Sequence, residues 1–320
     1  MSEKDKSAGI RTSVRKVKVT EDSAGQRVDN FVMGELKGLP RNRVYRLLRK
    51  GEIRINGKRA TQSTRLESGD EVRLPPVTLT PDRPIKVSQS LSQKLLDSVL
   101  FEDKRVLVIN KPSGVAVHGG SGVSAGVVEA LRAARPDLKD LGLVHRLDRE
   151  TSGCLVMAKK RSALRALHAD FREGRVEKRY LAGCIGHWDF GQRTCRAPLE
   201  VRNRKGGERH VVVSDSGKES ATRFAPQAFY DGLTLLSAEP LTGRTHQIRV
   251  HANHVGHPLA GDERYGDPDL NWDLKQLGLP RLFLHAQSIS FSDDSGNEQL
   301  YNAPLPDDLE RFLGKLRRQQ

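Results

Sequence analysis

Residues that build disulfide or metal frameworks are scarce in this sequence. It has three cysteines, Cys154, Cys184 and Cys195, and no two are spaced as Cys-x-x-Cys, so neither a disulfide framework nor a zinc ribbon is expected. No apolar run approaches the roughly 18 residues that a membrane span needs. Residues 1–18 also lack the apolar core of a secretory signal. We therefore expect a cytoplasmic protein that does not enter a membrane.

The sequence contains partial matches to two nucleotide-binding motifs and a complete match to neither. Gly120, Gly122 and Gly126 nearly spell the dinucleotide fingerprint, but their last spacing is one residue too long. A Lys-Pro-rich loop also separates these glycines from the preceding strand. The Gly-Lys pair at 217–218 is followed by glutamate, where a Walker A motif needs serine or threonine. The sequence therefore predicts no nucleotide cofactor.

What the sequence has in excess is positive charge. Its 54 Lys and Arg residues against 40 Asp and Glu give a formal net charge of +14, which favours a polyanionic partner such as RNA. The excess is local, because residues 37–65 hold ten basic residues and one acidic residue. A footprint on RNA explains this bias, and the alternative is an arginine-rich surface that is merely solvated.

The basic segment has the pattern of a small α+β module. One helix is predicted over 28–36, and a second between Pro40, a good first residue, and Gly51, a good terminator. An alternating strand then runs into an Asn-Gly turn at 56–57, the strongest short signal for a hairpin. The basic residues expected to contact RNA are Arg41, Arg43, Arg46, Lys50 and Lys58.

These segments resemble the S4 RNA-binding domain. The resemblance rests on QRVDNF at 26–31, RNRV at 41–44, GEIRINGK at 51–58 and Gly-Asp at 69–70, in that order. It implies a grip on structured RNA. We accordingly expect a disordered N-terminus over 1–15, an S4 domain over 16–76, a linker over 77–98 and a larger domain over 99–320.

In the larger domain, strand-like runs outnumber helical ones. The runs lie at 105–110, 155–159, 176–183, 209–213, 221–224, 233–237 and 282–291, and turn signals separate many of them. Helical patterns are confined to short segments, among them 162–174 and 245–256. This predicts an α+β domain with a mixed, largely antiparallel sheet rather than a doubly wound parallel one.

The densest chemistry lies at His145–Gly153, HRLDRETSG, with apolar runs on both sides. Burying these charges unpaired would be too costly, so we expect the strands to deliver them to a cleft. Asp148 is suited to nucleophilic or general-base work. A surface ion pair with Arg146 or Arg149 is the alternative, and the spacing does not choose between them.

A histidine-rich segment, THQIRVHANHVGH at 245–257, reads as a helix with Thr245 as its N-cap. Its four histidines invite a metal site, but His246 would lie about 140° around the helix from His251, and no carboxylate or cysteine cluster completes a tetrahedral set. We therefore expect no metal. Arg249 on this helix could hold a carboxylate in its ionised form.

Four motifs in order resemble the pseudouridine synthases of the RluA type. They are KPSG at 111–114 with His-Gly at 118–119, HRLDRETSG at 145–153, KRYLA at 178–182 and TGRTHQIRVH at 242–251. The resemblance covers about residues 100–310 and implies the pseudouridine synthase fold. It also implies isomerisation of uridine in RNA without a cofactor, and with the S4 domain in front the expected substrate is large-subunit (23S) ribosomal RNA.

The resemblance also implies the site. Asp148 becomes the essential catalytic carboxylate, Tyr180 stacks on the base and helps proton transfer, Arg249 pairs with Asp148, and Arg146 acts in base flipping. Two other hypotheses remain: a non-catalytic RNA-binding factor that uses the S4 domain, and a metal-dependent RNA hydrolase that uses the histidine helix.

Overall fold

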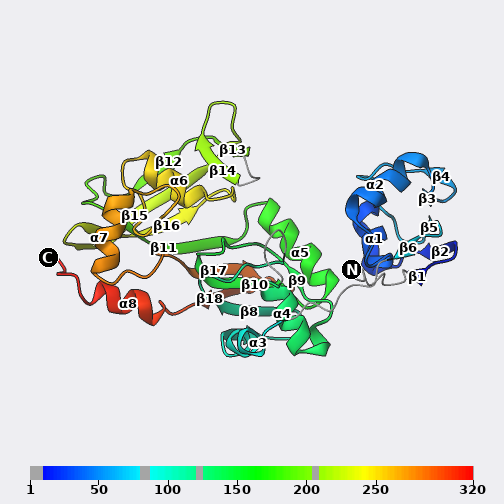
Figure 1. The fold of residues 1–320 in the computed structure, drawn as a ribbon, viewed down its shortest axis with the longest axis horizontal. Helices are drawn as coiled ribbons and strands as arrows, with labels where there is room; N and C mark the ends of the chain where they lie inside the picture. The colour runs from blue at the N-terminus through cyan, green and yellow to red at the C-terminus, as the bar shows by residue number, and fades with distance from the viewer. Residues whose placement is uncertain (1–9, 80–86, 120–124, 204–208, 320) are drawn as a thin grey trace, which may run out of the picture. The chain divides into compact units, whose positions relative to one another are not determined.

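The computed structural model describes residues 10–79, 87–119, 125–203 and 209–319. The contacts within the chain divide it into two units, residues 1–86 and residues 87–320 (Figure 1).

In the first unit, two helices share one apolar core with a four-stranded antiparallel sheet of strand order β2-β5-β3-β4. A separate pair is formed by β1 and β6. The elements are β1 (Ile10–Arg11), β2 (Arg15–Lys18), η1 (Glu21–Ser23), α1 (Val28–Glu35), α2 (Arg41–Lys50), β3 (Arg54–Ile55), β4 (Lys58–Arg59), β5 (Glu71–Leu74) and β6 (Thr78–Leu79).

Local signals predicted the two helices and the β3–β4 hairpin of this unit. Helix α2 begins after Pro40 and ends at Gly51, whose φ of 70° lets its N–H donate to the last helical carbonyls. The apolar residues Val44, Leu47 and Leu48 of α2 lie on one face and are buried. Asn56 and Gly57, with φ of 48° and 76°, form the left-handed pair that a tight hairpin between β3 and β4 requires.

The prediction of a disordered N-terminus over 1–15 is wrong for its last residues. Strand β1 pairs with β6, and the backbone N–H and side-chain hydroxyl of Thr12 both donate to the carbonyl of Val77. Sixty-five positions separate these two residues, so no local pattern reveals the pairing. Residues 1–9 lie outside the described part of the chain.

The prediction of a linker over 77–98 is also wrong in part. It contains β6 and helix α3 (Gln89–Leu96), which Ser88 caps by accepting a hydrogen bond from the N–H of Leu91. Leu95 is fully buried, which gives this polar helix its place in the second unit. Residues 80–86 lie outside the described part.

The second unit is built on a ten-stranded sheet. Its path runs β12-β15-β16-β11-β17-β10-β8-β7, with β18 added beside β17 and β9 beside β10. Among the strand pairs of the described chain, β10–β17 alone is parallel. The predicted α+β class with a mixed, largely antiparallel sheet is therefore confirmed.

The remaining elements of the second unit follow in chain order. They are β7 (Val99–Glu102), β8 (Val106–Lys111), α4 (Val127–Ala134), η2 (Pro136–Leu138), β9 (Gly142–Leu143), β10 (Ser152–Ala158), α5 (Arg161–Arg172), β11 (Glu177–Ile185), β12 (Arg193–Arg196), β13 (Leu199–Asn203), β14 (Arg209–Val213), β15 (Ala221–Tyr230), β16 (Leu233–Pro240), α6 (Gln247–His254), α7 (Pro268–Gln276), β17 (Leu284–Ser292), β18 (Glu298–Asn302) and α8 (Asp307–Leu313).

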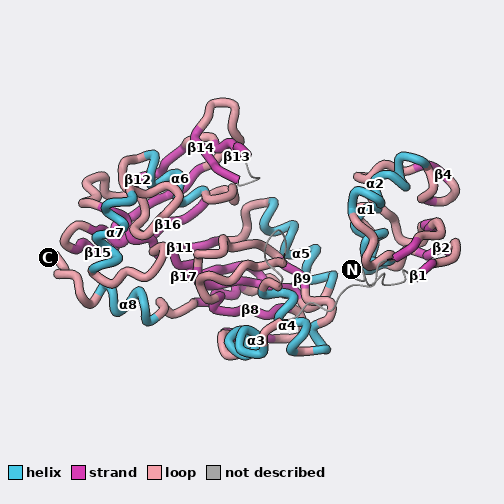
Figure 2. Tube along the Cα trace, in the orientation of Figure 1, coloured by secondary structure: helices cyan, strands magenta, loops and turns pink. Residues whose placement is uncertain are grey.

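Helices cover both faces of this sheet (Figure 2). Successive side chains of a strand point to opposite faces, and the cores follow that rule. Leu107 and Leu155 pack with helices α3 and α4, whereas their neighbours Val106 and Val156 pack with α5. At the other end of the sheet, α6 and α8 contribute to two further cores.

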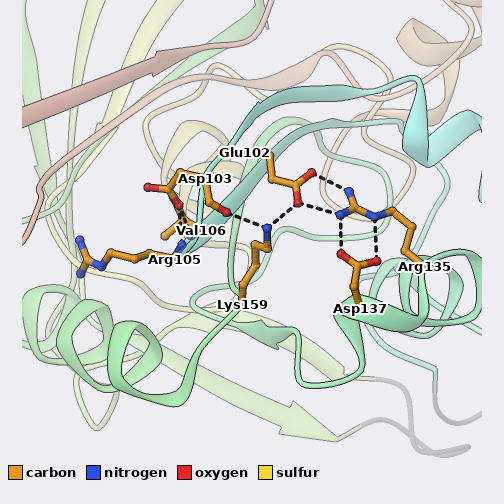
Figure 3. A network of polar contacts seen from close by, with 7 residues as sticks. All are labelled: Glu102, Asp103, Arg105, Val106, Arg135, Asp137 and Lys159. Atoms are coloured by element: carbon orange, nitrogen blue, oxygen red, sulfur yellow. Dashed lines mark hydrogen bonds and ion pairs between the residues drawn. The ribbon is translucent and has the colours of Figure 1, made fainter.

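A cluster of ion pairs fixes the β7 end of the sheet (Figure 3). Glu102 on β7 accepts two hydrogen bonds from Arg135, at 2.6 and 2.9 Å, and one from Lys159 at 2.5 Å. Arg135 also donates to Asp137. The cluster links β7 to the end of α4 and the end of β10. The hydrogen bonds from Arg135 are the largest cause of the lowered pKa of Glu102.

Candidate active site

A cavity of about 300 Å³ opens where the loop before β10 meets β11 and the entrance of α6. All three residues predicted to carry the chemistry, Asp148, Tyr180 and Arg249, line it, and so does Arg146. The sequence therefore identified side chains that the fold brings to one place. The other lining residues include His145, Phe171, Lys178, Thr242, Arg244 and His246.

A buried lysine anchors the loop that carries Asp148. The Nζ of Lys111, at the end of β8, donates to the carbonyls of Pro112, Val115 and Arg149 at 2.9–3.1 Å. Burial lowers the pKa of Lys111 to about 7, against the opposing charges of Glu150 and Asp148. The loop is thus fastened directly behind Asp148, whose side chain is 18 % exposed.

Tyr180 reaches the cavity from the middle of β11. It pairs with Ala238 on β16 and with Ala286 on β17, and the register of the β17 pairing shifts between Arg179 and Tyr180. Burial, and after it the charge of Asp148, raises the pKa of Tyr180 well above its ordinary value. The phenol therefore stays protonated at neutral pH.

The predicted ion pair between Arg249 and Asp148 is wrong. The Nε and Nη2 of Arg249 instead donate to the two carboxylate oxygens of Asp262, both at 2.7 Å. Asp262 is 1 % exposed and also accepts the backbone N–H groups of Arg264 and Tyr265. Among the described residues no hydrogen bond or ion pair joins Arg249 to Asp148.

The sequence missed this partner because Asp262 follows α6 in a loop whose course no local pattern specifies. Burial opposes the charge of Arg249, but its hydrogen bond to Asp262 raises its pKa, and the charge of Asp148 adds to the same effect. Arg249 thus remains a fixed cation in the wall of the cavity.

His246 is a site residue that the sequence weighed only as a metal ligand. It lies just before α6 in the left-handed conformation, with φ of 52°, so that it and not Thr245 is the N-cap. Its Nε2 is 3.9 Å from Oδ2 of Asp148, and its Nδ1 is 2.7 Å from the hydroxyl of Tyr265. Its position in the motif TGRTHQIRVH was the one signal that could have found it.

His145 forms another part of the wall. Its Nε2 accepts the N–H of Val156 at 3.0 Å, and its ring stacks on Phe171 with centroids 5.1 Å apart. Burial lowers the pKa of His145 to about 3, so the ring is neutral. Lys178, whose pKa burial also lowers, lies 5.7 Å from the Phe171 ring centroid.

The histidines of α6 have separate partners. His251 is fully buried and bonds to Thr222 and to the carbonyl of Ala197, and His257 bonds to the carbonyl of Ile185. Within the described ranges, no three His, Cys, Asp or Glu residues gather as a metal site would require.

The basic residues predicted to contact RNA lie on helix α2 and strand β4 of the first unit. Arg41, Arg46, Lys50 and Lys58 are exposed. Arg43 is half-buried, and its Nη1 lies 3.5 Å from the carbonyl of Thr78. None of the described helices is long and apolar enough to cross a membrane.

Comparison with known proteins shows which family and domain models match this chain. The family model described as RNA pseudouridylate synthase matches residues 105–254, and the S4 domain model matches residues 26–72. Several relatives carry the name Ribosomal large subunit pseudouridine synthase C. The one from Pasteurella multocida is 49% identical, covering 100% of this chain and 99% of that protein, and the one from Escherichia coli K12 is 50% identical, covering 95% and 97%.

Solved structures agree with the sequence relatives. Human RNA Pseudouridylate Synthase Domain Containing 4 superposes with a TM-score of 0.60 at 26% identity, covering 72% of this chain and 97% of that one. Human RNA Pseudouridylate Synthase Domain Containing 1 gives a TM-score of 0.59 at 25% identity, covering 76% and 92%.

Proposed function

The chain belongs to the RNA pseudouridylate synthase family, and we propose that it isomerises uridine in large-subunit ribosomal RNA with Asp148 as its catalytic carboxylate. It is a pseudouridine synthase with an S4 domain. Relatives named for large-subunit ribosomal RNA match nearly its whole length, which supports the same substrate here. A ribosomal substrate also supports a cytoplasmic location, which we propose for this protein.

The observation that carries the proposal is the shared cavity of Asp148, Tyr180 and Arg146. Its volume of about 300 Å³ suits one nucleotide that has left its helix better than a paired duplex. The Tyr180 ring can stack on the base, and its protonated hydroxyl can move a proton. Arg146 is exposed at the rim, where it can fill the space that the flipped base leaves.

Asp148 acts as a carboxylate in this scheme. Attack on the sugar, attack on the base and removal of a sugar proton all require its ionised form. The N-glycosidic bond from C1′ to N1 breaks and a carbon–carbon bond from C1′ to C5 of the same base forms. C5 then loses its proton to solvent and N1 gains one, so the product is an isomer and no second substrate is needed.

The role of Asp148 can be tested with Asp148→Asn by measuring tritium release from large-subunit RNA that contains 5-tritiated uridine. We expect release to fall by at least about 10³-fold, while RNA affinity stays near that of the parent protein. Asp140→Asn makes the same chemical change at an exposed position outside the cavity and should leave release unchanged. Turnover by Asp148→Asn at the parent rate would refute the role of Asp148.

The same assay separates the other two hypotheses. A metal-dependent hydrolase shortens the RNA and stops when a chelator is added, whereas an isomerase leaves the length and mass of the RNA unchanged. A non-catalytic binding factor releases no tritium. Pseudouridine mapping of ribosomal RNA from cells with and without this gene then identifies the modified positions.

A further inference from the structure

His246 and Tyr265, which the proposed mechanism does not use, form a row of polar contacts next to Asp148. His246 is 2.7 Å from the hydroxyl of Tyr265 through Nδ1 and 3.9 Å from Oδ2 of Asp148 through Nε2. Its side chain is 12 % exposed. The imidazole is therefore enclosed between a tyrosine that its surroundings fix and the carboxylate on which the chemistry depends.

The donors and acceptors around His246 favour one of its two neutral tautomers. The backbone N–H of Val211 donates to the Tyr265 oxygen at 3.1 Å. The single hydroxyl hydrogen of Tyr265 is then free to point at Nδ1 of His246, which becomes an acceptor. A neutral imidazole with an accepting Nδ1 carries its hydrogen on Nε2. That N–H faces Asp148.

The charge state of His246 agrees with a neutral ring that carries its hydrogen on Nε2. Burial lowers its pKa, Asp148 and Asp262 oppose the shift, and Arg249 and Arg264 reinforce it. The ring is therefore neutral at pH 7. The opposite tautomer would aim a lone pair at the Asp148 carboxylate and leave the Tyr265 hydrogen without an acceptor among the described residues.

Tyr265 is itself held from two sides. Its backbone N–H donates to Asp262, the same carboxylate that binds Arg249, and the Arg249 guanidinium lies 5.1 Å from its ring centroid. His246 is held in a backbone conformation that few residues other than glycine adopt, although Asn, Asp and His are the least disfavoured. Strain of this kind is found where a side chain must be aimed.

We propose that His246, held by Tyr265, is a positioning residue for Asp148: its Nε2–H donates to one carboxylate oxygen and leaves the other for the nucleotide. The inference rests on the proposed role of Asp148. The 3.9 Å separation is longer than a hydrogen bond, so the proposal requires the two groups to move closer together in the complex with RNA. Catalytic hydrogen bonds are often long before substrate binds and tighten in the complex.

Three variants test the proposal, each assayed by single-turnover tritium release and by RNA affinity. His246→Asn keeps a residue that tolerates the left-handed backbone but places no donor at the Nε2 position. We expect it to slow release by about 10- to 100-fold, the effect of losing a hydrogen bond to a charged group, with little change in affinity. His246→Gln places its amide N–H near the lost Nε2 and should restore most of the rate.

Tyr265→Phe keeps the ring against Arg249 and removes only the hydroxyl. The Nδ1 of His246 then has no donor, and the tautomer that faces Asp148 is no longer enforced. We expect slower release at pH 8 and recovery as the pH falls. The protonated imidazole of His246 carries a hydrogen on Nε2 whichever tautomer its neutral form adopts. The groups around His246 that could also titrate or act on it are Asp148, Arg249, Asp262, Arg264 and, against Tyr265, His210.

The outcomes are decisive. The proposal is overturned if His246→Asn releases tritium within about twofold of the parent rate, because losing a hydrogen bond to a charged group should have a far larger effect. If that variant does not fold, Tyr265→Phe decides, and a defect that does not depend on pH overturns it. Nitrogen-15 NMR of the histidines reads the tautomer without any turnover: Nε2–H supports the proposal even if the RNA proves to be a poor substrate, and Nδ1–H refutes it.

Discussion

Lys111 shows how one residue can organise the loop that carries the proposed catalytic carboxylate. A cation removed from water is costly unless hydrogen bonds replace its solvation, and Lys111 is fully buried. Three carbonyls, including that of Arg149 next to Asp148, supply those bonds. The remaining cost appears as the lowered pKa.

That cost predicts a pH dependence of stability. The folded protein has a pKa of about 7 at Lys111, and an unfolded lysine has one of about 10.4. Between these values Lys111 in the unfolded chain binds the extra proton, so its contribution to the free energy of unfolding should rise with pH. The slope is about 1.4 kcal/mol per pH unit within that window, and the gain is lost as the pH falls towards 7.

Lys111→Met should remove this slope, as measured by urea denaturation at pH 7 and pH 9. The exposed Lys139→Met makes the same change without burial and should keep the slope of the parent protein. Equal slopes for Lys111→Met and the parent would show that Lys111 is not the group that titrates.

At the scale of elements, the parallel contact between β10 and β17 joins two parts of the site. Gly153 on β10 pairs with Ala286 on β17, and Ala286 in turn pairs with Tyr180 on β11. The φ of Gly153 is 112°, and a Cβ there would lie 2.6 Å from the backbone nitrogen of Ala286. The strand that leaves the Asp148 loop therefore needs glycine at this point.

Gly153→Ala should lower the free energy of unfolding by about 3 kcal/mol or more, because both the backbone angle and the close contact are violated. Tritium release should fall with it, since β17 cannot shift without moving Tyr180. Gly114→Ala is a matched control: its φ is 82°, but a Cβ there meets nothing within 4 Å, so about 1 kcal/mol is expected. Equal losses in the two variants would contradict the role of the Ala286 contact.

Elements with local signals were predictable, and elements made by distant partners were not. Helix α2 and the Asn-Gly hairpin carry their caps and turn residues within a few positions. Strand β1 forms only because β6 lies beside it, and α3 has one fully buried apolar residue, so neither stands out in the sequence. Similarly, motif order identified Asp148 and Tyr180, but the partner of Arg249 depends on the course of a loop.

At the scale of the whole molecule, charge is unevenly divided between the two units. Residues 1–86 hold 20 Lys and Arg and 11 Asp and Glu, a net of +9, against +5 for the other 234 residues. Charge density of this kind draws in a polyanion over a distance, whereas the proposed role of the cavity is to hold one nucleotide. Binding and chemistry should therefore be separable by mutation.

Reversing Arg43, Arg46 and Lys50 to glutamate tests that separation. These residues follow one side of α2 at spacings of three and four, and two of them are exposed. Each lost phosphate contact removes about 0.7–0.9 from the slope of log affinity against log salt, so the slope should flatten by about two units. The rate of a single turnover at saturating enzyme should change little.

A control with the same change in net charge distinguishes a binding surface from a general effect of charge. Lys94, Lys104 and Lys139 are exposed residues of the second unit, and their reversal alters the total charge equally. If α2 carries the RNA, only the first triple variant shows a slope flattened by about two units. Equal slopes for both triple variants would mean that the arginine-rich helix is a solvated surface and that the RNA is held elsewhere.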